Sequence, residues 1–337
     1  MNPVIGWCSL TIVISTCTII LSALQVRKLG QKQIGDNWLK QLFSAKTSEH
    51  TSRTVTGNPI AWRERATSRQ NIGSVLSRWG FVGVCTLGLI ILITLYTTKA
   101  LSPDTFRTSI LFLVCGELLI VTFSAISISA SAITKEREDG TLDLLLTTSI
   151  TPILYLSGKV RGLVMHLLPM VLVPCITMMS VGALVLIDQN NAIVSDKLIA
   201  NSQYSNEISI PLALAVPAIL TPFVVIPYIA FCLTLGLLWS MRSKGSVGAI
   251  VATLILIFVV TSGLGICLVP SSSMGVVGSL FAALSPINLL FTTLSPATTL
   301  PELLSNGVLR ANIEFGISTI IAGGVWTLIS IGLLRSM

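Results

Sequence analysis

Seven stretches of the chain are apolar over lengths close to the ~20 residues that a helix needs to cross a bilayer. They are residues 4–25, 80–98, 108–133, 162–187, 209–240, 246–269 and 312–334. The stretch 209–240 carries four prolines, and because proline removes backbone hydrogen bonds we expect a broken or kinked span there. The pattern predicts an all-α polytopic membrane protein with about seven transmembrane helices.

Prolines also interrupt the apolar segment 270–305, which we expect to form short re-entrant or interfacial helices in place of a clean crossing. The composition fits a chain whose main solvent is lipid: 52% of the residues are hydrophobic and 10% are charged, against roughly 25% charged residues in soluble domains. The net charge of +7 is therefore interpreted as a topology signal, and no nucleic-acid partner is expected. All seven cysteines lie inside apolar runs, where we expect packing residues and no disulfide framework.

Basic residues indicate the orientation of the spans, because loops rich in Lys and Arg stay in the cytoplasm. Residues 26–79 contain ten of them against three acids, so this loop is predicted to be cytoplasmic. Alternation of the spans then places loops 134–161 and 241–245 on the same side. The N-terminus is expected outside and the C-terminus in the cytoplasm, in a multi-pass protein of the inner (cytoplasmic) membrane.

The chain before the second span divides into three predicted segments. Residues 1–25 form an extra N-terminal transmembrane helix; a signal peptide is the alternative, but no Lys or Arg precedes Arg27. Residues 26–57 form a cytoplasmic basic linker. Residues 58–78 are predicted to form an amphipathic helix in the membrane interface, because tryptophans share its apolar side and arginines take much of the rest; a plain solvated helix is the alternative. The candidate interfacial residues are Trp62, Arg63, Arg65, Arg69 and Trp79.

A run of charged residues, 135–139, breaks the apolar pattern between the third and fourth predicted spans. Gly140 permits a sharp change of direction after it, and Thr141 is placed to cap a short helix. Leu142, Leu145 and Leu146 would share one stripe of that helix. Leucines exposed on a cytoplasmic loop predict that a groove on a partner protein covers them.

This loop resembles the coupling loop of ABC-2-type transporter permeases, the transmembrane subunits of ABC exporters. The shared pattern is two spaced acids, then Gly-Thr-Leu-Asp-x-Leu-Leu, with Gly158 and Lys159 before the next span. The resemblance implies that residues 58–337 form a six-span permease domain with a connecting helix 58–78, a coupling loop 134–161 and an extracytoplasmic re-entrant region 270–305. It also implies a separate ABC ATP-binding subunit that docks on the loop, and a second permease subunit in a homo- or heterodimer. The partner-binding residues that it implies are Glu136, Glu138, Gly140, Thr141, Leu142, Asp143, Leu145 and Leu146.

The sequence has no phosphate-loop pattern, no metal-binding spacing and no nucleophile motif, so we expect no cofactor and no ATPase activity of its own. Two acids inside predicted spans, Glu117 and Glu314, are intramembrane polar candidates, because charge in the bilayer is costly and often functional. They motivate an alternative, an ion- or proton-driven secondary carrier. The basic loop 26–79 motivates another, a non-transport membrane scaffold. Members of the ABC-2 family move drugs, polysaccharides and lipids, so the resemblance implies no particular substrate.

Overall fold

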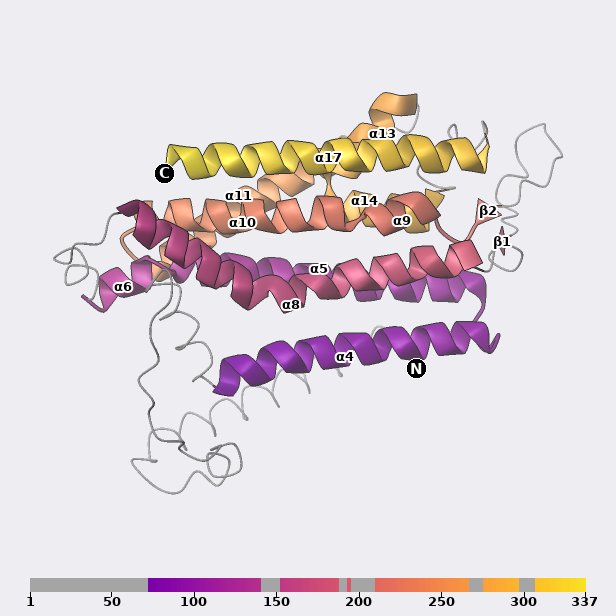
Figure 1. The fold of residues 1–337 in the computed structure, drawn as a ribbon, viewed down its shortest axis with the longest axis horizontal. Coiled ribbons are helices and arrows are strands. Elements are labelled where there is room, and N and C mark those ends of the chain that lie inside the picture. The colour runs from indigo at the N-terminus through magenta and orange to yellow at the C-terminus, as the bar shows by residue number, and fades with distance from the viewer. Residues whose placement is uncertain (1–71, 141–151, 188–192, 195–209, 267–274, 297–306) are drawn as a thin grey trace, which may run out of the picture. The chain divides into compact units, whose positions relative to one another are not determined.

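Helices make up nearly all of the structure, a computed structural model that describes residues 72–140, 152–187, 193–194, 210–266, 275–296 and 307–337 (Figure 1). These residues belong to one unit, Val55–Met337. The helices are α4 (Ile72–Thr97), α5 (Pro103–Ser131), α6 (Thr134–Glu138), α8 (Pro152–Ile187), α9 (Ala215–Leu220), α10 (Pro222–Arg242), α11 (Ser246–Ile266), α13 (Gly275–Leu284), α14 (Pro286–Leu294) and α17 (Val308–Ser336). Two short strands, β1 (Ile193–Val194) and β2 (Ile210–Pro211), pair antiparallel.

Six of the described helices are long and apolar enough to cross a bilayer, and the bent pair α13–α14 makes a seventh if it is counted as one span. The six spans are Val75–Thr97, Pro103–Glu138, Leu154–Ile187, Ala215–Arg242, Ser246–Leu264 and Val308–Ser336. They coincide with the six spans that the sequence predicts after residue 79, so an all-α multi-pass membrane protein is confirmed. The predicted segments 1–25 and 26–57 lie outside the described residues, as do Trp62, Arg63, Arg65 and Arg69.

Helix α10 lies at the centre of the bundle, packed against both α5 and α17, and is the most buried of the spans. Helix α4 lies at one edge, against α5 and α8, and α17 lies at the opposite edge with α13 (Figure 1). The interior is filled by large apolar side chains, among them Phe106, Leu237, Phe315 and Trp326. Helices α4 and α11 are the least buried spans and present most of their apolar side chains outward, as expected where the surrounding solvent is lipid.

The predicted break in segment 209–240 is confirmed. Helix α9 ends at Leu220, and Pro222 begins α10 after a single intervening residue, Thr221. Proline is tolerated at the first helical position because its missing N–H would have had no partner within the helix. The Thr221 hydroxyl donates to the carbonyl oxygen of Pro217 at 2.9 Å, which satisfies one backbone group at the break.

The structure differs from the sequence prediction at two helix boundaries. Residues 72–78, predicted to belong to an interfacial helix separate from the span, are continuous with the span in α4. Residues 152–161, predicted as the end of the cytoplasmic loop 134–161, form the first turns of α8. A single glycine inside a helix costs only about 1 kcal/mol, so the helices continue through Gly80 and Gly158.

The short helices α13 and α14 occupy the segment that the sequence predicts to lack a clean crossing. The chain bends by 118° between the two helices. Ser279 of α13 and Ser318 of α17 share a hydrogen bond of 2.8 Å, and the indole N–H of Trp326 donates to the Leu284 carbonyl at 2.9 Å. These bonds fix α13 to α17. Helix α14 packs against α5 and also contacts α11.

Candidate functional site

The five-residue helix α6 follows α5 closely and lies at the same end of the bundle as the C-terminus (Figure 1). Its sequence, TKERE, alternates bases and acids. Thr134 and Glu136 are buried, whereas the other three side chains are exposed. A helix this short has little stability in isolation, so its position depends on the contacts that it makes with its neighbours.

Glu136 connects α6 to the first turns of α8. Lys159 Nζ lies 2.9 Å from Glu136 Oε1, and the Tyr155 hydroxyl donates to Oε2. The Lys159 and Glu136 side chains are only 6% and 11% exposed. Removing one partner of such a buried ion pair costs about 3–5 kcal/mol, because the other charge then lacks compensation in a poor solvent. Glu136, which the resemblance assigns to partner binding, therefore has strong partners within the chain.

Arg137 and Glu138 connect α6 to the turn between α10 and α11. The Glu138 carboxylate accepts hydrogen bonds from the backbone N–H of Ser246, at 2.8 Å, and from its hydroxyl, at 3.2 Å. A negative charge is stabilised at this N-terminus of α11 by the unpaired N–H groups and the helix dipole. The Arg137 guanidinium donates to the carbonyl oxygens of Ser243, at 3.0 Å, and Met241, at 3.3 Å.

A buried serine of α10 completes the connection. Ser240 Oγ accepts hydrogen bonds from the backbone N–H groups of Ile133, at 3.0 Å, and Thr134, at 3.1 Å. We call these contacts of residues 133–138 with α8, α10 and α11 the α6 junction. Sequence reasoning missed the roles of Arg137 and Ser240; the available signal was the serine itself, because a polar side chain in an apolar helix needs a hydrogen-bond partner.

Gly140 comes two residues after the α6 junction, and its φ of +68° is a left-handed backbone conformation of the kind that the sequence predicts for a glycine at this position. The chain is described again from Pro152, the first residue of α8. Segment 141–151 therefore leaves α6 and returns to α8, the two helices that Glu136 joins. The remaining predicted partner-binding residues lie outside the described residues: Thr141, Leu142, Asp143, Leu145 and Leu146.

Glu117 is enclosed in the bundle where α5 meets α8. Its exposed fraction is 1%, and the Thr177 hydroxyl of α8 donates to Oε1 at 3.2 Å. Among the described residues, Oε2 has no hydrogen-bond partner. Cys85 of α4 and Cys175 of α8 lie within electrostatic range of this carboxyl group, and both are free thiols. An acid at this depth is costly, so Glu117 stays a candidate for a structural or pathway role.

Glu314 and Trp79 lie at the surface of the bundle. Arg310 Nε donates to Glu314 Oε1 at 2.7 Å, one turn earlier in α17, and the two side chains are 65% and 21% exposed. An exposed pair of this kind contributes little to stability, and it satisfies the charge of Glu314 locally. Trp79 is 56% exposed, with the Arg78 guanidinium 5.8 Å from its ring centre, which is the geometry of a cation–π pair.

In the part of the chain that the structure describes, no group of three or more His, Cys, Asp or Glu side chains could hold a metal ion. No family model matches the chain, and no curated protein matches it either. The α6 junction is a polar connection between helices that are otherwise apolar.

Proposed function

We propose that this chain is the transmembrane permease subunit of an ATP-driven exporter of the ABC-2 type, with ATP hydrolysis in a separate nucleotide-binding subunit. The α6 junction is the observation that carries the proposal. It joins one short charged helix to three membrane-spanning helices directly before the segment with the coupling-loop motif. Apolar spans alone are shared by many classes of membrane protein and favour no particular one.

A docking segment transmits force only if it is firmly attached to the helices that have to move. Segment 141–151 follows α6 and precedes α8, so a partner that displaces it would act on α8 directly. Through Arg137 and Glu138 the same displacement would reach the turn between α10 and α11. Helix α10 is the most buried span, so a shift at its end would displace side chains at the centre of the bundle.

The contacts suggest a division of roles within the coupling motif. Glu136 and Glu138 hold α6 in place, because their carboxylates are bonded within the chain. The leucines of segment 141–151, Leu142, Leu145 and Leu146, would then supply the apolar contact with the ATP-binding subunit. The proposed motor would thus bind the leucines, and the acids would pass its movement to the spans.

The positive-inside rule supports a cytoplasmic position for α6. Six spans after the basic loop 26–79 would return the C-terminus to the cytoplasm, and the C-terminus indeed lies at the same end as α6 (Figure 1). We propose an inner-membrane location with the N-terminus outside. A second permease subunit, identical or similar, would complete the pathway as a homo- or heterodimer.

An ion- or proton-driven carrier is the second candidate, and the enclosed carboxyl group of Glu117 is the observation that favours it. A transported ion needs a polar path to its site. Glu117 does not line the cavity between α5, α10, α11 and α14, and Glu314 is paired with Arg310. The exporter explains the α6 junction, which a carrier driven by an ion gradient does not require. Transport that follows a pH gradient without ATP would select the carrier.

The ATPase activity of the protein isolated from its native membrane tests the proposal. The wild-type complex, purified through a tag on this chain, should hydrolyse ATP, because the nucleotide-binding subunit is recovered with it. A Leu145→Asp/Leu146→Asp variant should be recovered in equal amount but without ATPase activity. Leu309→Asp is the control, since Leu309 is 77% exposed and lies in the first turn of α17, at the other end of this helix from the C-terminus. Wild-type protein that shows no ATPase activity would argue against the exporter.

A further inference from the structure

Arg78 lies near the start of α4 and contacts α8. Its Nη1 donates to the carbonyl oxygen of His166 at 3.4 Å, and its guanidinium lies 5.8 Å from the ring centre of Trp79. The side chain is partly buried. These two contacts hold the guanidinium beside α8, but they leave its charge uncompensated, because neither a carbonyl group nor an indole ring carries a net charge.

No carboxylate compensates the charge of Arg78 in the part of the chain that the structure describes. The ion pairs there involve Arg107, Lys159 and Arg310, and a cation in apolar surroundings is costly without a counter-ion. The Nε atom of Arg78 is shielded from solvent, whereas Nη2 is accessible and makes no hydrogen bond to a described residue. Nη2 is therefore the atom that can donate to an anion from outside the chain.

The depth of Arg78 restricts the source of that anion. The span begins at Val75, so Arg78 lies only ~4.5 Å along the helix from its start, at 1.5 Å per residue. The head-group layer on each side of a bilayer is about 5–7 Å thick, which places the guanidinium at the level of the lipid phosphates. Helix α4 begins at the end of the bundle where α6 and the C-terminus lie (Figure 1). The proposed topology assigns this end to the cytoplasmic leaflet, whose lipids give it a negative surface potential.

The surface around Arg78 is apolar and open to the surroundings. Leu76 and Trp79 of α4 are 69% and 56% exposed, and Met165, next to His166 in α8, is 47% exposed. In a membrane-spanning bundle such a surface faces lipid. A soluble phosphate ion gains nothing from these side chains, whereas the acyl chains of a lipid pack against them. A lipid with an anionic head group therefore fits both the uncompensated cation and the apolar surface beside it.

We propose that Arg78 binds the phosphodiester of an anionic phospholipid, with a phosphate oxygen accepting a hydrogen bond from Nη2 and an acyl chain against the exposed side chains of α4 and α8. Arginine and phosphate form short, charge-assisted hydrogen bonds. A head group whose only charge is the phosphate neutralises the guanidinium, whereas a zwitterionic head group brings a cation of its own. The site should therefore prefer phosphatidylglycerol to phosphatidylcholine. Binding at this site does not depend on transport or on an ATP-binding subunit.

Photoaffinity labelling of the full chain in phosphatidylcholine nanodiscs tests the lipid class. The probes are phosphatidylglycerol and phosphatidylcholine with the same diazirine-bearing acyl chain. The phosphatidylglycerol probe should label the peptides around Arg78 and His166 at about fivefold lower concentration, the factor that one interfacial cation supplies. Equal labelling of these peptides by the two probes would overturn the proposal.

A competitor separates a lipid phosphate from a free one, since both share the chemistry that Arg78 recognises. Excess inorganic phosphate, added at constant ionic strength, should leave labelling by the phosphatidylglycerol probe unchanged. Displacement of the probe by inorganic phosphate would identify a site for a soluble anion and would overturn the assignment to a lipid.

Three variants localise the site. Arg78→Gln removes the charge and should weaken phosphatidylglycerol labelling about fivefold, to the level of phosphatidylcholine. Arg78→Lys keeps a cation and should retain the preference, which separates the charge of the side chain from a packing role. The control is Arg242→Gln, since this arginine is exposed in the last turn of α10 whereas α4 packs against α5 and α8; it should change nothing. A preference that survives Arg78→Gln, disappears in Arg78→Lys or falls equally in Arg242→Gln would refute this site, and the wild-type comparison decides alone if Arg78→Gln does not fold.

Discussion

Replacing Lys159 by Met tests the buried ion pair that joins α6 to α8. The Lys159 and Glu136 side chains are 6% and 11% exposed, and the substitution removes the ammonium group that lies 2.9 Å from Glu136 Oε1 while the Tyr155 hydroxyl still donates to Oε2. We expect the free energy of unfolding to fall by about 3 kcal/mol, the lower end of the ~3–5 kcal/mol for breaking a buried pair, because the hydroxyl still donates. Lys135→Met is the matched control, since this exposed lysine of α6 should change the free energy of unfolding by no more than about 0.5 kcal/mol.

A double-mutant cycle with Glu136→Gln separates the pair from its surroundings. The glutamine and methionine side chains that the two substitutions introduce are both uncharged. The free energy of unfolding of the double variant should therefore fall by only about 1 kcal/mol. The coupling energy between the two sites should then be at least ~2 kcal/mol. Unfolding would be followed by tryptophan fluorescence during SDS titration of protein in mixed micelles. If the two single losses simply add, or if Lys159→Met is as stable as the wild type, the pair does not hold α6 against α8.

Three further outcomes follow from the packing and the polar contacts. Gly323→Ala should destabilise the bundle, because a Cβ there would overlap the Phe223 carbonyl of α10, whereas Gly324→Ala, with nothing within 4 Å, should be neutral in the same unfolding assay. Glu138→Ala should cost about 1 kcal/mol by removing the cap of α11, and increased hydrogen exchange should be confined to the first turn of that helix; an unchanged pattern would contradict the cap. Glu117→Gln should keep ATP-driven activity, since Thr177 can still donate to the amide oxygen; complete loss of activity with normal folding would instead support ion coupling through Glu117.

The spans could be predicted from the sequence because each is a long apolar run, and the break before Pro222 because proline acts locally. The starts of α4 and α8 could not be predicted, since the sequence pattern assigns residues 72–78 to an interfacial helix and residues 152–161 to the cytoplasmic loop. In the structure these residues are helical and make tertiary contacts that the pattern does not reveal. Arg78 donates to the carbonyl oxygen of His166 at 3.4 Å, and Lys159 pairs with Glu136.

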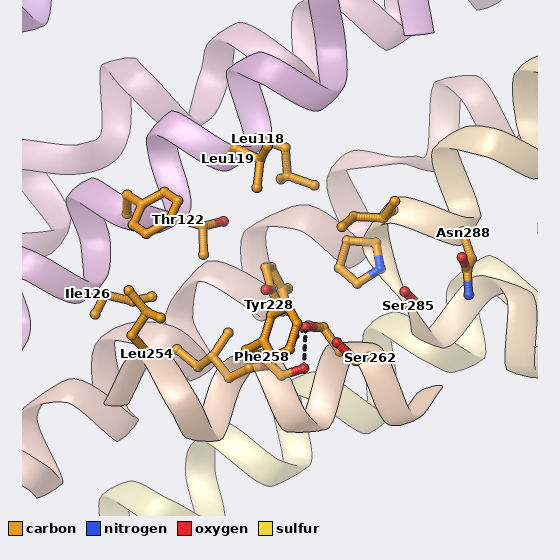
Figure 2. Close-up of a pocket in the computed structure, with 15 residues that line it drawn as sticks. Leu118, Leu119, Thr122, Ile126, Tyr228, Leu254, Phe258, Ser262, Ser285 and Asn288 are labelled. Atoms are coloured by element: carbon orange, nitrogen blue, oxygen red, sulfur yellow. Dashed lines mark hydrogen bonds between the residues drawn. The ribbon is translucent and has the colours of Figure 1, made fainter. Parts of the chain in front are cut away.

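The sequence indicates the charged residues of the α6 junction but not their partners. The charged run 135–139 marked the place, and the family resemblance marked the acids, but their partners lie 19 to 108 positions away along the chain. Hydrophobic periodicity contains no information about such pairs. The cavity between α5, α10, α11 and α14 could not be predicted, because it depends on how α14 packs against α5 and α11 (Figure 2).

Photo-crosslinking from position 145 in living cells tests most directly whether the α6 region couples this bundle to a motor. A photoreactive amino acid at Leu145 should give one adduct, with a protein whose sequence contains a phosphate loop, and the same residue at Leu309 should not capture that protein. Adducts at 145 that contain only lipid, or only proteins from outside the cytoplasm, would contradict the proposed coupling.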